Sequence, residues 1–289
     1  MTTIPKLILI EGLPGSGKTT AAGLVHELLT SMDIDARLYT EGNLEHPADY
    51  DGVACFEEHE FAELLCSYDE YRDFLNEHII RQDGRCFLEY RKLQQEYGPE
   101  FPDELLQAIF QKDIYELPLE DNRKLITERW RKFTANAAAG QGTFIFDCCF
   151  IQNPVTVGMI KYGADKETVT GYVTELAATI EPLNPLLIYI TQHELDHSFK
   201  KAVRERPVEW SQGFIEYYTN QGYGAQHQYS GLAGTLQVLK ARQELEADIY
   251  SSLTIAKHKA DNSAFDNEGL KQRIAGILET CFNTERQPD

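Results

Sequence analysis

The sequence predicts an α/β fold, in which helices pack against a parallel β-sheet. Five short apolar runs are separated by helical patterns, an order that is typical of layered α/β domains. In addition, the first run leads directly into a glycine-rich loop and an amphipathic helix, which is a recognised strand–loop–helix unit. The five predicted strands are residues 6–11, 36–41, 143–147, 186–191 and 252–257.

The first strand is followed by a predicted phosphate-binding loop. Residues 12–19 read GLPGSGKT and match the pattern G-x-x-x-x-G-K-[ST], and apolar residues at helical spacing follow. Glycines let such a loop curl so that its N–H groups face an anion. The alternative is an ordinary glycine-rich turn, but such a turn would not need Lys18 and Thr19 at its end. We expect Lys18 to reach the outer phosphates of ATP and the Thr19 hydroxyl to ligate Mg²⁺. The residues predicted to bind the nucleotide in this loop are Gly12, Pro14, Gly15, Ser16, Gly17, Lys18, Thr19 and Thr20.

Two carboxylates stand where predicted strands end, the edge at which open parallel sheets bind ligands. Asp147 ends the run FIFD. An acidic residue directly after buried apolar residues is suited to bind Mg²⁺. The structural alternative is that Asp147 caps the N-terminus of a helix. Glu41 ends the second predicted strand, where its carboxylate could take the proton of an attacking hydroxyl. The alternative is that Glu41 is a polar loop residue without a catalytic role. We therefore expect Thr19 and Asp147 to hold Mg²⁺, and Lys18, Glu41 and Asp147 to be catalytic.

A long stretch between the second and third strands, 53–138, reads as mostly helical and is predicted to be an insertion in one domain spanning residues 1–289. A second stretch, 207–234, carries five glycines and several aromatic residues, which favours an irregular lid or substrate wall over an ordinary surface loop. The lid region as a whole is predicted to span 193–234.

A basic cluster precedes this second stretch. Residues 197–207, HSFKKAVRERP, hold four basic side chains against one acid. Arg206 precedes Pro207, which disfavours helical geometry, so its side chain is predicted to reach a transferring phosphoryl group. Arg204 is the second predicted catalytic cation. The structural alternative is a set of cations that stabilise the last turn of a helix.

Composition narrows the class of protein. The chain has 289 residues and a formal net charge of −19, which disfavours binding to nucleic acid or anionic membranes. No apolar run approaches the length of a membrane span, and the N-terminus does not read as a signal peptide. The six cysteines, which include the neighbours Cys148 and Cys149, suggest no disulfide framework, so a reducing cytoplasm is expected.

These residues resemble the P-loop kinases of the nucleoside monophosphate kinase type, with thymidylate kinase and the deoxynucleoside kinases nearest. The resemblance lies in GLPGSGKTT, in Glu41, in FIFD at the third strand and in RER after the fourth. It implies a three-layer P-loop NTPase with sheet order 2-3-1-4-5, a helical insertion that holds the acceptor, and a basic lid over ATP. In thymidylate kinases an Arg follows the Asp at the end of the third strand, whereas in this chain Cys148 and Cys149 follow Asp147.

Three other interpretations remain open at this stage. HELDH, His193–His197, matches the zinc-peptidase pattern H-E-x-x-H, but TQHE also reads as a helix capping box. HKAD, 258–261, resembles the guanine-reading motif of GTPases, with His258 in place of Asn, although the same loop through Asn262 suits adenine contact in a kinase. The third interpretation is a nucleotide-dependent regulatory ATPase.

The sequence is therefore interpreted as an ATP- and Mg²⁺-dependent kinase that phosphorylates a hydroxyl of a small molecule such as a nucleoside, metabolite or antibiotic. A nucleoside monophosphate kinase is the alternative. Stretch 44–78 holds eleven acids and one base, Arg72, which makes a poor phosphate site. A neutral or cationic acceptor is expected for that reason. The aromatic residues expected to stack on it are Tyr50, Phe56, Phe61, Tyr68 and Tyr71. The alternatives are that the acids form a solvated helix face, or that arginines from outside the stretch fold back and supply positive charge.

Overall fold

The computed structural model describes residues 4–282, which divide into two compact units. Unit 1 contains the chain up to Glu41 and from Trp130 onward, and unit 2 is Gly42–Arg129. The chain enters unit 2 after the second strand and leaves it within helix α6 (Leu119–Ala139). Unit 2 thus covers most of the stretch predicted as an insertion, but it begins and ends earlier than 53–138.

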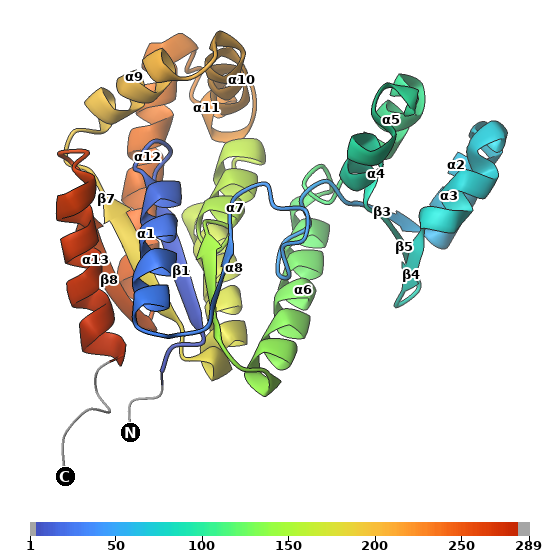
Figure 1. The fold of residues 1–289 in the computed structure, drawn as a ribbon. Helices are drawn as coiled ribbons and strands as arrows, with labels where there is room; N and C mark the ends of the chain where they lie inside the picture. The colour runs from blue at the N-terminus through green and yellow to red at the C-terminus, as the bar shows by residue number, and fades with distance from the viewer. Residues whose placement is uncertain (1–3, 283–289) are drawn as a thin grey trace. The chain divides into compact units, whose positions relative to one another are not determined.

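Unit 1 is an α/β unit with a five-stranded parallel sheet, as predicted (Figure 1). Its strand order is β2-β6-β1-β7-β8, which reads 2-3-1-4-5 when only the strands of this sheet are counted along the chain. Every residue of the central strand β1 is buried, which explains the apolar run of residues 7–10 that begins it. The strands are β1 (Leu7–Gly12), β2 (Ala36–Tyr39), β6 (Thr143–Asp147), β7 (Leu186–Thr191) and β8 (Ala256–Asp261).

The last strand differs from the prediction. Residues 252–257 were expected to form it, but Ser252 still belongs to helix α12 and β8 begins at Ala256. In β8, Ala260 is buried, and the other side chains are partly or fully exposed, since the strand lies at the sheet edge. An edge strand of this kind lacks the apolar run by which a buried strand is recognised. The apolar residue Leu253 instead caps the end of α12 and is buried there.

Helices cover both faces of the sheet, as in a three-layer arrangement (Figure 1). On one face, α1 and α13 pack against Ile188 and Ile190 of β7. On the other face, Tyr189 of β7 hydrogen-bonds to Glu246 of α12, and Trp130 of α6 packs edge-on against Phe146 of β6. The alternation of side chains along the strands therefore supplies two hydrophobic layers.

The other helices of unit 1 carry the site described below or support it. The two longest besides α6 are α12 (Gly231–Ser252) and α13 (Asn267–Phe282). The remaining ones are α1 (Lys18–Ser31), α7 (Gln152–Val155), the π-helical turn η3 (Thr156–Lys161), α8 (Lys166–Ile180), η4 (Glu181–Leu183), α9 (Leu195–Glu205), α10 (Val208–Thr219) and α11 (Gly222–Gln226).

The stretch 207–234, predicted to be irregular, is helical. It forms α10, α11 and the first turn of α12. Trp210, Phe214 and Tyr218 recur every four residues along α10, and their rings pack in sequence, with centroid distances of 5.2 and 4.0 Å. Two of the glycines that suggested a loop begin helices instead: Gly222 and Gly231 are the first residues of α11 and α12, with positive φ angles of 43° and 58°.

Unit 2 contains a three-stranded antiparallel sheet in addition to the expected helices. The sheet order is β3-β5-β4, and Asp83 and Gly84, both at positive φ, form the turn between β4 and β5. An Asp-Gly pair is a hairpin signal that the prediction of a mostly helical stretch overlooked. The elements are β3 (Ala54–Glu57), α2 (Glu58–Ser67), η1 (Asp69–Tyr71), α3 (Arg72–His78), β4 (Ile80–Gln82), β5 (Arg85–Leu88), α4 (Tyr90–Tyr97), η2 (Gly98–Glu100) and α5 (Asp103–Phe110).

The predicted stacking surface of stretch 44–78 is largely part of the core of unit 2. Phe56 and Phe61 are buried in its hydrophobic cluster, and Tyr50 stacks on Phe87. Several acids of the stretch form ion pairs with bases from outside it, which explains how so acidic a segment folds. These pairs are Glu45–Lys92, Asp51–Arg91, Glu57–Arg85, Glu58–Arg81 and Glu60–Lys112.

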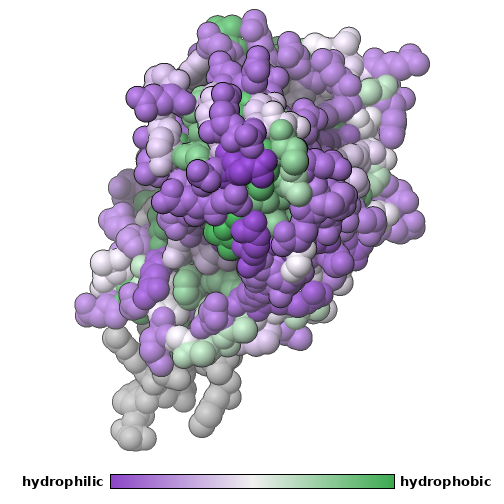
Figure 2. Space-filling model, turned by 90° about the vertical axis from the view of Figure 1, so that its right-hand side faces the viewer, coloured by the Kyte–Doolittle hydropathy of each residue, from purple (hydrophilic) through white to green (hydrophobic). Residues whose placement is uncertain are grey.

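Hydrophilic side chains cover much of the molecular face in Figure 2, in keeping with the high charge of the chain. Among the described residues, no helix is both long and apolar enough to cross a membrane.

Candidate functional site

The predicted phosphate loop joins the end of β1 to the start of α1. Glycine is required in this loop for two reasons: a larger side chain would clash with neighbouring atoms, and the backbone adopts positive φ angles. A Cβ atom on Gly12 would lie 2.6 Å from the carbonyl oxygen of Ile190, and one on Gly17 would lie 2.5 Å from the amide nitrogen of Asn262. Gly15 and Gly17 have φ angles of 82° and 93°, which other residues rarely adopt. The loop therefore has the tight curl that a phosphate cradle needs.

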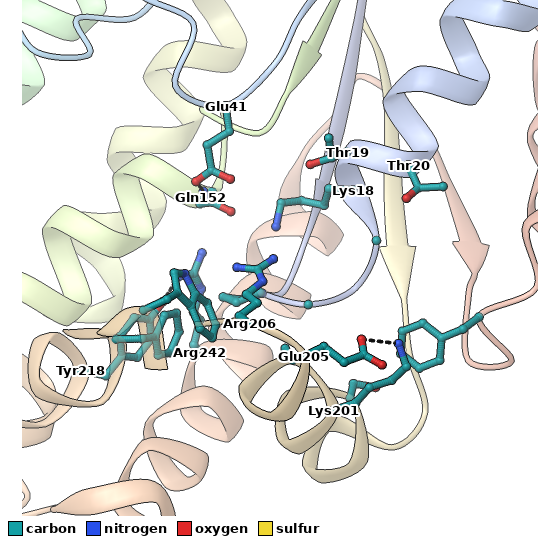
Figure 3. Close-up of a pocket in the computed structure, with 18 of the residues that line it drawn as sticks. Lys18, Thr19, Thr20, Glu41, Gln152, Lys201, Glu205, Arg206, Tyr218 and Arg242 are labelled. Atoms are coloured by element: carbon teal, nitrogen blue, oxygen red, sulfur yellow. Dashed lines mark hydrogen bonds and ion pairs between the residues drawn. The ribbon is translucent and has the colours of Figure 1, made fainter. Parts of the chain in front are cut away.

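A cavity of about 490 Å³ opens over this loop, and every residue that lines it belongs to unit 1 (Figure 3). The loop and the start of α1 form one wall, and helices α9 and α10 form another. The residues that line it are Pro14, Gly15, Gly17, Lys18, Thr19, Thr20, Glu41, Gln152, Thr156, Ser198, Lys201, Ala202, Glu205, Arg206, Trp210, Phe214, Tyr218, Arg242 and Phe265.

Lys18 and Glu41, both predicted to be catalytic, line the same cavity from different elements (Figure 3). Lys18 begins α1 and is 7% exposed, and within residues 4–282 its Nζ makes only a long contact of 3.4 Å to the carbonyl oxygen of Leu13. Glu41 follows β2 and accepts a 2.7 Å hydrogen bond from the side-chain amide of Gln152. A carboxylate can only accept hydrogen bonds, so this contact fixes which end of the Gln152 amide faces Glu41.

Asp147 is buried at the end of β6, and both of its carboxylate oxygens lack a well-formed hydrogen bond among the described residues. Burial raises the pKa of Asp147, while the neighbouring Thr19 hydroxyl and the Lys18 charge lower it. A buried carboxylate without a partner is costly, and an oxygen-ligating cation beside the Thr19 hydroxyl would remove that cost. Thr19 and Asp147 thus fit a Mg²⁺ site, whereas the N-cap alternative is not supported, since in the described part of the chain no helix N–H donates a cap hydrogen bond to Asp147.

A buried acid that the sequence analysis missed, Glu11, organises the chain just after Asp147. Its carboxylate accepts hydrogen bonds of 2.7, 2.8 and 3.1 Å from the backbone N–H groups of Phe150, Ile151 and Gln152. Burial raises the pKa of Glu11 to about 7, although the backbone N–H of Ile151 opposes that shift. Glu11 therefore joins the phosphate loop to the start of α7, which carries Gln152. Its signal in the sequence is an acid inside an otherwise apolar strand.

The structure separates the two predicted arginines of the basic cluster. Arg206 caps α9 with an extended backbone, as its position before Pro207 predicted, and lines the cavity with its guanidinium 4.2 Å from the Trp210 ring. Arg204 is exposed on α9 and does not line the cavity. Lys201, by contrast, lines it and pairs with Glu205 at 2.8 Å.

Asn262 lies beneath the phosphate loop rather than in the cavity wall. Its side-chain nitrogen donates a 2.8 Å hydrogen bond to the carbonyl oxygen of Ser16, and the residue is 5% exposed. The expected contact with adenine is therefore not supported by its position. Phe265 and Thr20 line the cavity instead, and the Lys201 ammonium lies 4.4 Å from the centre of the Phe265 ring.

Two of the alternative motifs, HELDH and HKAD, lie in secondary structure that does not suit zinc binding or guanine recognition. Helix α9 begins at Leu195 with Glu194 as its N-cap, so the predicted Thr191 capping box is wrong and His193 lies outside the helix that holds His197. The two histidines therefore lack the one-turn helical spacing that zinc binding requires. HKAD, expected after the last strand, forms part of β8, where His258 pairs with Ile188. A guanine-reading loop needs to follow the strand rather than lie within it.

Arg242 is a second functional candidate that the sequence analysis missed. It lies in the middle of α12, is fully buried and lines the cavity. Its Nε donates to Glu246 at 2.6 Å, and its Nη1 donates to Tyr218 at 2.6 Å and to Thr156 at 3.1 Å. Burial by itself lowers the pKa of Arg242, but Tyr218 and Glu246 raise it above its ordinary value, so the guanidinium is charged.

Comparison with known proteins gives no family assignment: no protein-family model matches the sequence, and no curated protein matches it significantly.

Proposed function

We propose that this protein is an ATP- and Mg²⁺-dependent phosphotransferase that acts on a hydroxyl group of a small molecule. The observation that carries the proposal is that one cavity holds both the phosphate loop, with Lys18 and Thr19, and the carboxylate of Glu41. A phosphate loop alone serves any nucleotide-binding protein. A carboxylate in the same cavity, with its own orienting partner in Gln152, supplies the base that an attacking hydroxyl needs.

In this proposal each residue has a defined task. The loop N–H groups and Lys18 hold the phosphates of the donor, and Arg206 offsets the charge that develops during transfer. Glu41 takes the proton of the attacking hydroxyl, and Gln152 keeps the carboxylate in place. Catalysis then consists mainly of positioning and charge neutralisation. Arg204, which lies outside the cavity, has no part in it.

Magnesium would be held by Thr19 and Asp147, and the structural support is a buried carboxylate beside the Thr19 hydroxyl, with no well-formed hydrogen bond among the described residues. When bound, the ion supplies charge neutralisation on the phosphate oxygens of the donor. The chain's own contribution is to bury the Asp147 carboxylate, which raises its pKa, while the Thr19 hydroxyl and the Lys18 charge oppose that rise.

The proposal is tested by measuring ATP consumption over a library of hydroxyl-bearing metabolites, nucleosides and nucleoside monophosphates. We expect at least one compound to raise the rate of ADP release well above the rate without acceptor, and Lys18→Ala to remove that increase. Slow hydrolysis that no compound stimulates would instead favour the regulatory ATPase. Stimulation by nucleoside monophosphates alone would favour the nucleoside monophosphate kinase.

A further inference from the structure

The cavity contains a buried guanidinium whose hydrogen-bonding capacity is only partly used. Nε and Nη1 of Arg242 have partners in Glu246, Tyr218 and Thr156. Its Nη2 atom is buried and has no hydrogen-bond partner among the described residues. Buried donors are almost always paired in folded proteins, so an unpaired N–H donor on a residue that lines the cavity points to a missing ligand.

The carboxylate beside Arg242 does not supply the missing partner. One oxygen of Glu246 accepts from Arg242 Nε, and the other accepts a 2.5 Å hydrogen bond from the Tyr189 hydroxyl. This arrangement fixes the guanidinium plane and leaves Nη2 outside the ion pair. Figure 3 shows Arg242 and Tyr218 together on one side of the cavity, away from Thr20 and the predicted nucleotide side.

The groups at this end of the cavity are hydrogen-bond donors. Arginine has no acceptor atom, and the Tyr218 oxygen already accepts from Arg242, so its own O–H remains available to donate. A set of donors around a charged guanidinium selects a group that only accepts hydrogen bonds, and an oxyanion is the strongest such group.

The charge of the cavity agrees with this selection. Lys18, Lys201, Arg206 and Arg242 line it against the two carboxylates of Glu41 and Glu205. Glu246, which pairs with Arg242 at 2.6 Å, offsets a third cation. In a chain with a formal net charge of −19, this excess of cations is local to the site. More positive charge is present than the loop alone requires, and part of it lies beside the aromatic wall of α10.

We propose that Arg242 and Tyr218 bind an oxyanion, a carboxylate or a phosphate ester, carried by the acceptor molecule. This inference rests on the proposed function and makes it more specific, since the acceptor then carries an anionic group in addition to its hydroxyl. It replaces the expectation of a neutral or cationic acceptor. That expectation depended on residues 44–78, and none of them is among the residues that line this cavity.

The test measures binding of two small probes, methyl phosphate and acetate, by calorimetry. The phosphate loop is first filled with Mg²⁺ and a non-hydrolysable ATP analogue, so that a probe cannot bind there. Tyr218→Phe is the main variant, because it keeps the ring that stacks on Phe214 at 4.0 Å and removes only the hydroxyl. Tyr217→Phe is the matched control, because the adjacent Tyr217 does not line the cavity. Arg242→Gln is the second variant, provided that its melting curve shows a folded protein.

We expect at least one probe to bind the wild-type protein, with affinity reduced about tenfold or more in Tyr218→Phe and unchanged in Tyr217→Phe. Binding of methyl phosphate alone assigns a phosphate ester, and binding of acetate alone assigns a carboxylate. If neither probe binds, or if the two tyrosine variants bind alike, the subsite is overturned.

The two proposals can fail separately. If the ATP analogue does not bind, the proposed phosphotransferase is wrong. The probes are then titrated into Lys18→Ala protein without nucleotide, in which the loop is disabled. Probe binding that Tyr218→Phe still weakens in that background supports the oxyanion subsite independently, and its absence overturns it.

Discussion

The side-chain amide of Gln152 donates a 2.7 Å hydrogen bond to the carboxylate of Glu41. The two residues are 111 positions apart in the chain: Gln152 begins α7, and Glu41 lies in the turn that follows β2. The start of α7 is in turn fixed by Glu11, which accepts the backbone N–H of Gln152 at 3.1 Å. A carboxylate that is oriented in this way across a cavity from Lys18 is the arrangement that a general base requires.

Glu41→Gln tests that role. The amide keeps the size of the side chain but cannot take a proton, so we expect the maximal rate of acceptor phosphorylation to fall at least about 10²-fold. The Michaelis constant for ATP should change little. Gln152→Ala, which removes only the orienting partner, should cost less than Glu41→Gln. Equal rates for the wild type and Glu41→Gln in steady-state assays would show that Glu41 does not act as a base.

Arg206→Ala and Arg204→Ala form a matched pair, since both residues are arginines at the end of α9 and only Arg206 lines the cavity. We expect Arg206→Ala to lower the maximal rate about 10²-fold with a smaller effect on the Michaelis constant for ATP, because the contact strengthens in the transition state. Arg204→Ala should have nearly wild-type kinetics. If both variants lose activity equally, the cluster acts through the charge or the stability of α9 rather than through contact.

Asp147→Asn should impair the use of Mg²⁺ more than the binding of ATP. The amide keeps the shape but loses the charge that holds the metal. The Mg²⁺ concentration for half-maximal activity should therefore rise at least about tenfold. The assay is a Mg²⁺ titration of activity at fixed ATP. A variant with an unchanged Mg²⁺ curve would leave Asp147 as a structural residue.

Glu11→Gln should change the pH dependence of stability. Burial raises the pKa of Glu11 from 4.5 to about 7, so the folded protein holds this proton more tightly than the unfolded chain does. The stabilisation is complete below the unfolded pKa and is lost as the pH rises through about 7. Between these values the wild type should lose about 1.4 kcal/mol of unfolding free energy per pH unit relative to Glu11→Gln, which cannot titrate.

Urea unfolding of both proteins at about pH 5 and about pH 8 measures this difference. The unfolding free energy of the wild type should fall more between the two conditions than that of Glu11→Gln. Parallel pH dependences of the two proteins would show that Glu11 is ionised throughout, held by its three backbone hydrogen bonds.

Local patterns were sufficient to predict the parallel sheet and part of the site. The strands 143–147 and 186–191 have the predicted bounds, because buried central strands are continuous apolar runs. The extended backbone of Arg206 followed from the proline after it. These features depend on residues that are neighbours in the chain.

The missed residues depend on contacts that sequence spacing does not reveal. Arg242 and Glu246 are four positions apart on a helix, which reads as an exposed ion pair, yet both are almost fully buried. Glu11 meets Phe150 across 139 positions of chain. Asn262 was placed near the nucleotide by its position after the last strand, but the direction of its side chain, toward Ser16, is set by packing.

The most direct test of the proposed function follows the γ-phosphoryl group of labelled ATP. After the acceptor has been found by ATP consumption, wild-type and Lys18→Ala proteins are incubated with it, and the products are separated. We predict that the label appears on the organic acceptor and that Lys18→Ala lowers this transfer at least about 10²-fold while its melting temperature stays near that of the wild type. Label recovered only as inorganic phosphate, or equal transfer by both proteins, would contradict the proposal that this cavity transfers phosphate to a second molecule.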